Sequence, residues 1–317
     1  MPTGILLLDK PLGLSSNRAL QTVRRALGAR KAGHLGTLDP LATGMLPICL
    51  DEATKVIALI EGGRKAYRFG IALGTRTTTG DTEGTVAETR LVPSLEAGAI
   101  KAQLASLRGE QWQVPPMYSA LKRDGEPLYR LARAGIEVER KPRRVELYRL
   151  ELLAQGDARL VLECECSKGT YVRVLAEQIA TALGTCGHVD ELRRLSVEPF
   201  EAQTMVSLEE LLADPAQAVV AHLKRADSAV QSLPALAFAP HDVSALRQGR
   251  SVALAVATVP QNVPGGPSVA ARGRAPGQDT LRVRLYALAA PGEFLGLGEI
   301  VGEVVLPRRL FVPLDST

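Results

Sequence analysis

The chain has 317 residues, of which 46% are hydrophobic and 23% charged, which is ordinary for a soluble protein and predicts two domains. Its apolar runs are too short for a signal peptide or a membrane span, and its four cysteines are too few for a disulfide framework. We therefore expect a cytoplasmic protein with reduced thiols and no membrane partner. The net charge is only +4, but residues 1–68 hold ten Lys and Arg against five Asp and Glu. This local excess is expected where a phosphate backbone approaches, although a solvated helix face would explain it equally well.

The N-terminal part of the chain predicts a strand, a helix, a loop, and a second strand and helix. Residues 4–8 read as a short buried strand, and residues 15–28 as a helix whose N-cap is Ser15 or Ser16. After a loop, an apolar run predicts a strand over residues 45–50. The next segment begins with two acidic residues, which favours a helix over residues 51–63.

The loop between these elements has the sequence GHLGTLDPLATGMLP and spans residues 33–47. Flanking glycines permit tight turns around Asp39, and Pro40 biases the backbone of Asp39 to an extended conformation. Asp before Pro is also a common way to begin a turn. By composition alone, Asp39 is therefore better explained as part of a structural turn than as a functional carboxylate.

Strands and helices continue without a strict alternation through the middle of the chain. The alternating segment 65–73 predicts a strand that ends in a polar loop over residues 74–84. Further elements follow in chain order: a helix over 95–107, a strand pair over 145–153 and 160–166, a helix over 170–184 and a strand over 188–200. This order favours an α+β fold with a mixed, largely antiparallel sheet over a doubly wound parallel sheet.

The C-terminal part predicts a small β-rich domain. We place the first domain at residues 1–228 and the second at 234–317, joined by the linker AVQSLP. Short strands are predicted over residues 251–256, 280–288, 294–301 and 303–311. Eight of the eighteen residues from Pro260 to Gly277 are Pro or Gly, which predicts a disordered insert over about 260–277.

Two kinds of catalytic site find little support in the residues. Cys164, Cys166, Cys186 and His188 could form a metal site, but Cys164 and Cys166 alternate along an apolar strand and are better explained as core residues. The sequence contains no GxSxG or HExxH motif and no phosphate-binding glycine loop. We therefore expect neither a metal nor a cofactor. What remains is a reaction that depends on one carboxylate in a chain with a basic N-terminal region, which points towards RNA.

Five motifs in the chain are similar to those of a known family. They are DKPLGLSS (9–16), GHLGTLDPLATGMLPICLDEATK (33–55), KAYRFGIALGTRTTTGDTEG (65–84), VPPMYSALK (114–122) and CSKGTYVRVLAEQIATALGTCGHVDELRRL (166–195). In this order they resemble the TruB-type family of bacterial tRNA pseudouridine-55 synthases, over about the first 210 residues. The C-terminal part resembles the small PUA-like RNA-binding domain of that family more loosely.

The resemblance implies a pseudouridine-synthase catalytic domain that isomerises a uridine of the tRNA T loop without a cofactor. Asp39 matches the catalytic aspartate, and Arg173 matches the arginine that accompanies it. Tyr67 matches the tyrosine that stacks on the extruded uracil and takes part in removal of the C5 proton. The attack of Asp39 on C1′, its attack on uracil C6, and glycal formation all stay open as routes.

The same resemblance implies the substrate contacts and the partner. Tyr171 and Leu192 match residues that line the uracil pocket, and His34 matches the histidine that inserts into the T loop in place of the flipped base. The chain differs from the family pattern at Leu35, where threonine is common, and at Thr78, where many relatives carry aspartate. The expected partner is the T arm of tRNA, bound by a monomer. The alternative is a non-catalytic tRNA-binding or tRNA-folding protein that uses the same surface.

Overall fold

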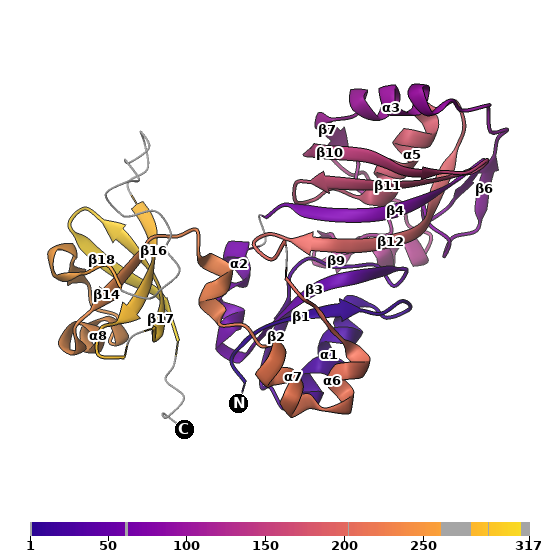
Figure 1. The fold of residues 1–317 in the computed structure, drawn as a ribbon. Helices are drawn as coiled ribbons and strands as arrows, with labels where there is room; N and C mark the ends of the chain where they lie inside the picture. Colours follow the sequence, from indigo (N-terminus) through magenta and orange to yellow (C-terminus); the bar gives the residue numbers. More distant parts are fainter. Residues whose placement is uncertain (1, 61–62, 202, 261–279, 291, 312–317) are drawn as a thin grey trace.

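The computed structural model contains one large and one smaller β-sheet, together with two short two-stranded sheets (Figure 1). Strands from residues 4–207 form the large sheet, and strands from residues 235–310 form the smaller one. The structure describes residues 2–60, 63–201, 203–260, 280–290 and 292–311.

Within the described residues, the large sheet has nine strands and is mostly antiparallel. Its order is β13 (Val206–Ser207), β1 (Gly4–Lys10), β3 (Ala42–Leu50), β12 (Gly187–Val197), β4 (Lys65–Leu73), β11 (Arg159–Cys166), β10 (Arg143–Gln155) and β7 (Gly109–Gln113), with β2 (Ala32–His34) also paired to β3. Among the strand pairs described in this sheet, β1–β13 and β3–β12 are parallel and the others antiparallel. The prediction of an α+β fold with a mixed, largely antiparallel sheet is therefore confirmed.

Helices cover the two halves of this sheet separately (Figure 1). Helix α3 (Ala97–Ser106) contacts β10, and α5 (Val172–Ala182) contacts β12 and β4. At the other half, α1 (Ser16–Ala26) and α6 (Leu208–Ala213) pack against β3 and β1. The remaining helical segments around the large sheet are η1 (Asp51–Val56), α2 (Ile57–Ile60), α4 (Leu128–Arg133), α7 (Pro215–His222) and η2 (Ala226–Val230).

The alternating pattern of β11 explains how its residues divide between core and surface. Leu160, Leu162, Cys164 and Cys166 are all fully buried, whereas the residues between them are only partly buried. All four cysteines are free and buried. Cys164 and Cys166 are therefore core residues, as their position on an apolar strand predicted. No helix of the described residues is long and apolar enough to cross a membrane.

Two predicted elements differ from the observed ones by more than a few residues at their ends. The helix expected over residues 51–63 is a 3-10 helix over Asp51–Val56, followed by one α-helical turn over Ile57–Ile60. Ala53 and Val56 are buried three residues apart, which fits the three-residue period of a 3-10 helix. The strand expected over residues 251–256 is limited to β15 (Val252–Ala253), because a 3-10 turn, η3 (Leu254–Val256), follows at once.

The smaller sheet has five strands in the order β14 (Ala235–Phe238), β16 (Thr280–Ala287), β17 (Phe294–Val301), β18 (Val304–Leu310) and β15. Helix α8 (Pro240–Arg247) contacts β18 and β15. Leu297 of β17 belongs to the same buried cluster as Ile5 and Leu7 of β1, so the two sheets share apolar contacts. Apart from Pro260, the predicted insert at 260–277 lies outside the described residues.

Candidate active site

Asp39 lies in the segment that connects β2 to β3. The chain reverses there with the help of Gly36, whose φ of +68° is a conformation that glycine adopts without strain. The hydroxyl of buried Ser16 in α1 donates to the carbonyl oxygen of Leu38 (2.9 Å) and accepts from the backbone N–H of Leu38 (2.7 Å). Both hydrogen bonds tie the residue before Asp39 to a helix, so the position of Asp39 is fixed by regular structure.

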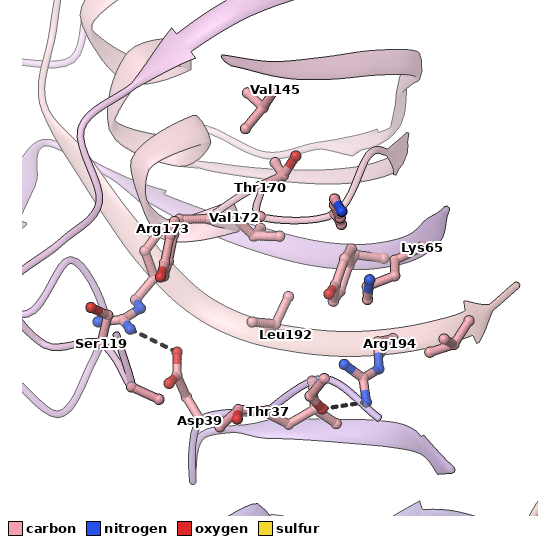
Figure 2. A pocket seen from close by; sticks show the side chains of 18 of the residues that line it. Thr37, Asp39, Lys65, Ser119, Val145, Thr170, Val172, Arg173, Leu192 and Arg194 are labelled. Carbon is pink, nitrogen blue, oxygen red and sulfur yellow. Dashed lines mark hydrogen bonds and ion pairs between the residues drawn. The ribbon is translucent and has the colours of Figure 1, made fainter. Parts of the chain in front are cut away.

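A cavity of about 580 Å³ opens beside this segment. Its walls come from the Asp39 segment, β4, β12, the first turn of α5 and residues 119–121, and Figure 2 shows their side chains converging on one space. Five of the six predicted site residues line it: Asp39, Tyr67, Tyr171, Arg173 and Leu192. These residues come from four separate parts of the sequence, and the fold brings them together.

Arg173 holds the carboxylate of Asp39 in place. Arg173 is 5% exposed, and its Nη2 lies 2.9 Å from Asp39 Oδ2 (Figure 2). The same guanidinium donates to the carbonyl oxygens of Thr79 (2.8 Å) and Tyr118 (2.7 Å). A second carboxylate, that of buried Asp81, has its Oδ2 3.5 Å from Arg173 Nη1. Two carbonyls and two carboxylates thus surround the guanidinium, which leaves it little freedom to move.

The electrostatic environment of Asp39 is a balance of opposed effects. Burial raises the pKa of this carboxyl above its usual range, and the nearby charge of Asp81 adds to the increase. The charge and hydrogen bond of Arg173 lower the pKa, as does the charge of Lys10. About a third of the Asp39 side chain is exposed, and it faces the cavity. The carboxylate is therefore accessible to a molecule in the cavity and is poorly hydrated.

Tyr67 and Leu192 form an apolar part of the cavity wall. They lie on the neighbouring antiparallel strands β4 and β12 and are 7% and 6% exposed. Burial raises the pKa of the Tyr67 phenol to about 12, although the charge of Arg194 opposes this increase. Tyr171 precedes α5, and burial likewise raises the pKa of its phenol. A flat base that entered the cavity would thus meet neutral aromatic side chains.

His34 does not line the cavity. It ends strand β2, opposite Ile48 of β3, and is half-buried. Burial and the charge of Arg194 lower the pKa of the imidazole, so the ring is neutral at neutral pH. Its Nδ1 is buried and has no hydrogen-bond partner among the described residues. His34 is therefore separate from the group around Asp39, at the other end of the segment that carries it.

Several polar residues of the site were not predicted from the sequence. Lys65, Ser119, Lys168 and Arg194 line the cavity, and Asp81 supports Arg173 from behind. Arg194 could have been found, because it lies two residues after Leu192 on the same strand and side chains at this spacing share a face. Of the two departures from the family pattern, Leu35 is buried in the core, and the Thr78 hydroxyl bonds to Thr85. Among the described residues, the ion-pair partner of Asp39 is Arg173 rather than either of these two.

Comparisons with known proteins agree on one family. Residues 24–172 match the model of the TruB family pseudouridylate synthase (N terminal domain), and residues 173–231 match that of the tRNA pseudouridylate synthase B C-terminal domain. The second match ends before the five-stranded sheet begins.

Relatives named tRNA pseudouridine synthase B align with almost the whole chain. The protein of Azoarcus sp. (strain BH72) is 43% identical, and the alignment covers 97% of this chain and 94% of the relative. That of Aromatoleum aromaticum is 47% identical over 97% of this chain and 92% of the relative. Among solved structures, a chain of a Cbf5-Nop10-Gar1 complex has the same fold, with a TM-score of 0.73 and 24% identity over 99% of this chain and 86% of that chain.

Proposed function

Because the chain belongs to the TruB family of pseudouridylate synthases, we propose that it converts the T-loop uridine at position 55 of tRNA to pseudouridine. The observation that carries this proposal is the contact between Asp39 and Arg173 at the wall of a cavity of about 580 Å³. A carboxylate held by a buried guanidinium, beside Tyr67 and Leu192, supports chemistry on a flat uncharged base.

The reaction rearranges bonds without gain or loss of atoms. The C1′–N1 bond breaks, the uracil turns, C1′ joins C5, and the C5 proton is replaced by a proton at N1. No oxidant, reductant or group donor is required, so the reaction needs no cofactor. In this proposal ionised Asp39 attacks C1′ or uracil C6 or assists glycal formation, and Arg173 keeps the carboxylate ionised and oriented.

The target base must leave its stack before it can reach Asp39, which costs a few kcal/mol. We propose that Tyr67 stacks on the flipped uracil and takes part in removal of the C5 proton, while Tyr171 and Leu192 keep water away from it. His34 would insert into the space that the base leaves in the T loop. Its position outside the cavity and the lowered pKa of its imidazole support this role, because a neutral ring stacks on bases without a change of charge.

The remaining parts of the proposal concern the whole chain. Residues 1–228 would act as the catalytic domain, and residues 234–317 as a PUA-like domain that adds affinity for tRNA. The protein would act as a monomer.

The alternative function is a non-catalytic tRNA-binding or tRNA-folding protein. A pure binder gains nothing from a poorly hydrated carboxylate near bound phosphates, which Asp39 would repel. The two functions are separated by incubating the protein with an unmodified tRNA transcript and mapping pseudouridine along it. We expect modification at position 55 and none in a transcript with cytidine there. If the protein binds the transcript and forms no pseudouridine, the enzyme proposal is wrong.

A further inference from the structure

Arg194 is a fully buried cation that no carboxylate neutralises within the described ranges of the chain. Its Nε donates to the carbonyl oxygen of Met45 (2.7 Å), and its Nη2 donates to the carbonyl oxygens of Leu35 (3.2 Å) and Gly36 (3.0 Å). Its Nη1 is also buried, and it has no hydrogen-bond partner among the described residues. One side of the guanidinium is therefore occupied by backbone, and the other retains unused donors.

The unused side belongs to the cavity that contains Asp39. Arg194 lines this cavity, and Figure 2 shows its guanidinium between strand β12 and the segment that carries Thr37 and Asp39. Arg194 lies directly opposite Tyr67 in the antiparallel pair of β12 and β4, so the two side chains share one face of the sheet. Leu192 occupies the same face two residues earlier.

Gly36 leaves room beside Nη1. A Cβ atom at this position would lie 3.0 Å from Nη1, closer than side chains normally approach. Any larger residue would therefore press on the only nitrogen of this guanidinium that lacks an acceptor among the described residues. The positive φ of Gly36 gives a second reason for glycine here.

An unpaired donor on a buried charge is costly, because burial removes water that would otherwise bind it. Three carbonyl contacts account for Nε and Nη2 but do nothing for Nη1. A ligand in the cavity that presents an acceptor to Nη1 would remove this cost. The acceptor need not be charged, since the groups that already interact with Arg194 are neutral: three carbonyl oxygens and the phenol of Tyr67.

We infer that Arg194 binds the target base itself, with Nη1 donating a hydrogen bond to a carbonyl oxygen of the flipped uracil. This inference rests on the proposed function, which places the uracil against Tyr67, the cross-strand neighbour of Arg194. Uracil has carbonyl oxygens at C2 and C4. If the contact is to O4, it also rejects cytosine, whose C4 amino group is a donor and would face a cation. The two buried arginines thus have separate tasks: Arg173 holds the carboxylate, and Arg194 holds the base.

The experiment replaces the acceptor atom and the donor in turn. Wild-type protein is given tRNA with uridine, 2-thiouridine or 4-thiouridine at position 55, each labelled with tritium at C5, and the release of tritium is followed in single turnovers. Sulfur is a weaker hydrogen-bond acceptor than oxygen. We expect one of the two thio substitutions to slow release about 10- to 100-fold, the loss that corresponds to a hydrogen bond from a charged donor.

The variant Arg194→Met removes the donor, and Arg193→Met is its matched control, because Arg193 points to the opposite face of β12 and pairs with Asp9. We expect Arg194→Met to react slowly with every substrate and to lose the discrimination between oxygen and sulfur, while Arg193→Met keeps the wild-type ratio. The ratio compares substrates within one variant, so partial misfolding lowers all rates alike and leaves the ratio unchanged.

If Arg194→Met does not fold, Arg194→Lys provides the same comparison with the charge retained and the forked donor lost. The inference is overturned if the wild type reacts equally with all three substrates, or if the variant at position 194 keeps the wild-type ratio. A wild type that releases no tritium from uridine would instead contradict the proposed function, so the two failures are distinguishable.

Discussion

Asp39 is a poorly hydrated acid that must be ionised to act, so its pKa sets the lower pH limit of activity. Burial raises this pKa more than Arg173 and Lys10 lower it. Since the active form is the deprotonated one, activity falls as the pH decreases through the raised pKa. We expect the midpoint of the single-turnover rate to lie above about 3.9, the value of an unperturbed aspartate. tRNA binding measured at each pH is the control, and a midpoint at or below the unperturbed value would contradict this reasoning.

Tyr67 provides a test of base stacking that is separate from binding. Tyr67→Ala removes the aromatic surface beside Leu192, and stacking on a base is worth about 1–3 kcal/mol. We expect the single-turnover rate to fall about 5- to 150-fold, with little change in tRNA affinity, because contacts to phosphates dominate binding. Tyr148→Ala, at an exposed position on β10, is the matched control. A parallel loss of affinity and rate in Tyr67→Ala would argue against stacking.

Individual residues differ in how far their environment follows from the sequence. Leu192 and Arg194 share a face by simple alternation, yet nothing in the sequence LRR tells which of the two adjacent arginines is buried. Arg193 pairs with Asp9 on one face, whereas Arg194, on the other face, donates to backbone carbonyls and lines the cavity. Asp81 was missed for a similar reason, because its contact with Arg173 joins segments that only the folded sheet brings together.

Helix α1 has a direct structural link to the active site through Ser16. Ser16→Ala leaves the N–H and carbonyl of Leu38 without their buried partner, which we expect to lower the free energy of unfolding by about 1–3 kcal/mol. The single-turnover rate should also fall, because Asp39 follows Leu38 directly. Ser15→Ala is the control: it removes the N-cap of the same helix at a cost of about 1 kcal/mol and should leave the rate intact. Equal rates in the two variants would show that this link does not position Asp39.

Elements with a clear period were predictable, and elements held by tertiary contacts were not. Strand β4 spans the predicted residues 65–73, and α1 begins after the predicted cap Ser15. The conformation of residues 51–60 instead depends on tertiary packing, because Ala53, Val56 and Ile60 belong to one buried cluster. Helix α8 was not predicted, although Pro240 at its first turn is a common start signal. Its residues gain stability from the C-terminal sheet, which local sequence does not encode.

A polar network joins the smaller sheet to η2, the helical turn that precedes it in the chain. The hydroxyl of buried Tyr286 donates to Asp227 Oδ2 (2.9 Å), and Arg225 binds the same carboxylate. Tyr286→Phe should lower the free energy of unfolding by about 1–3 kcal/mol. If the C-terminal sheet contributes to tRNA binding, this variant should also bind tRNA more weakly and keep its rate at saturation. Tyr148→Phe is the control, and unchanged affinity in a destabilised Tyr286→Phe would contradict a role for this junction in binding.

The most direct test of the proposed function compares Asp39→Asn with Asp9→Asn on unmodified tRNA. Asp39→Asn keeps the size of the side chain and removes its charge, whereas Asp9 is paired with Arg193 and does not line the cavity. We expect Asp39→Asn to bind tRNA as tightly as the wild type and to form no pseudouridine at position 55, while Asp9→Asn remains active. Pseudouridine formation by Asp39→Asn at a rate close to that of the wild type would contradict the central role of this carboxylate.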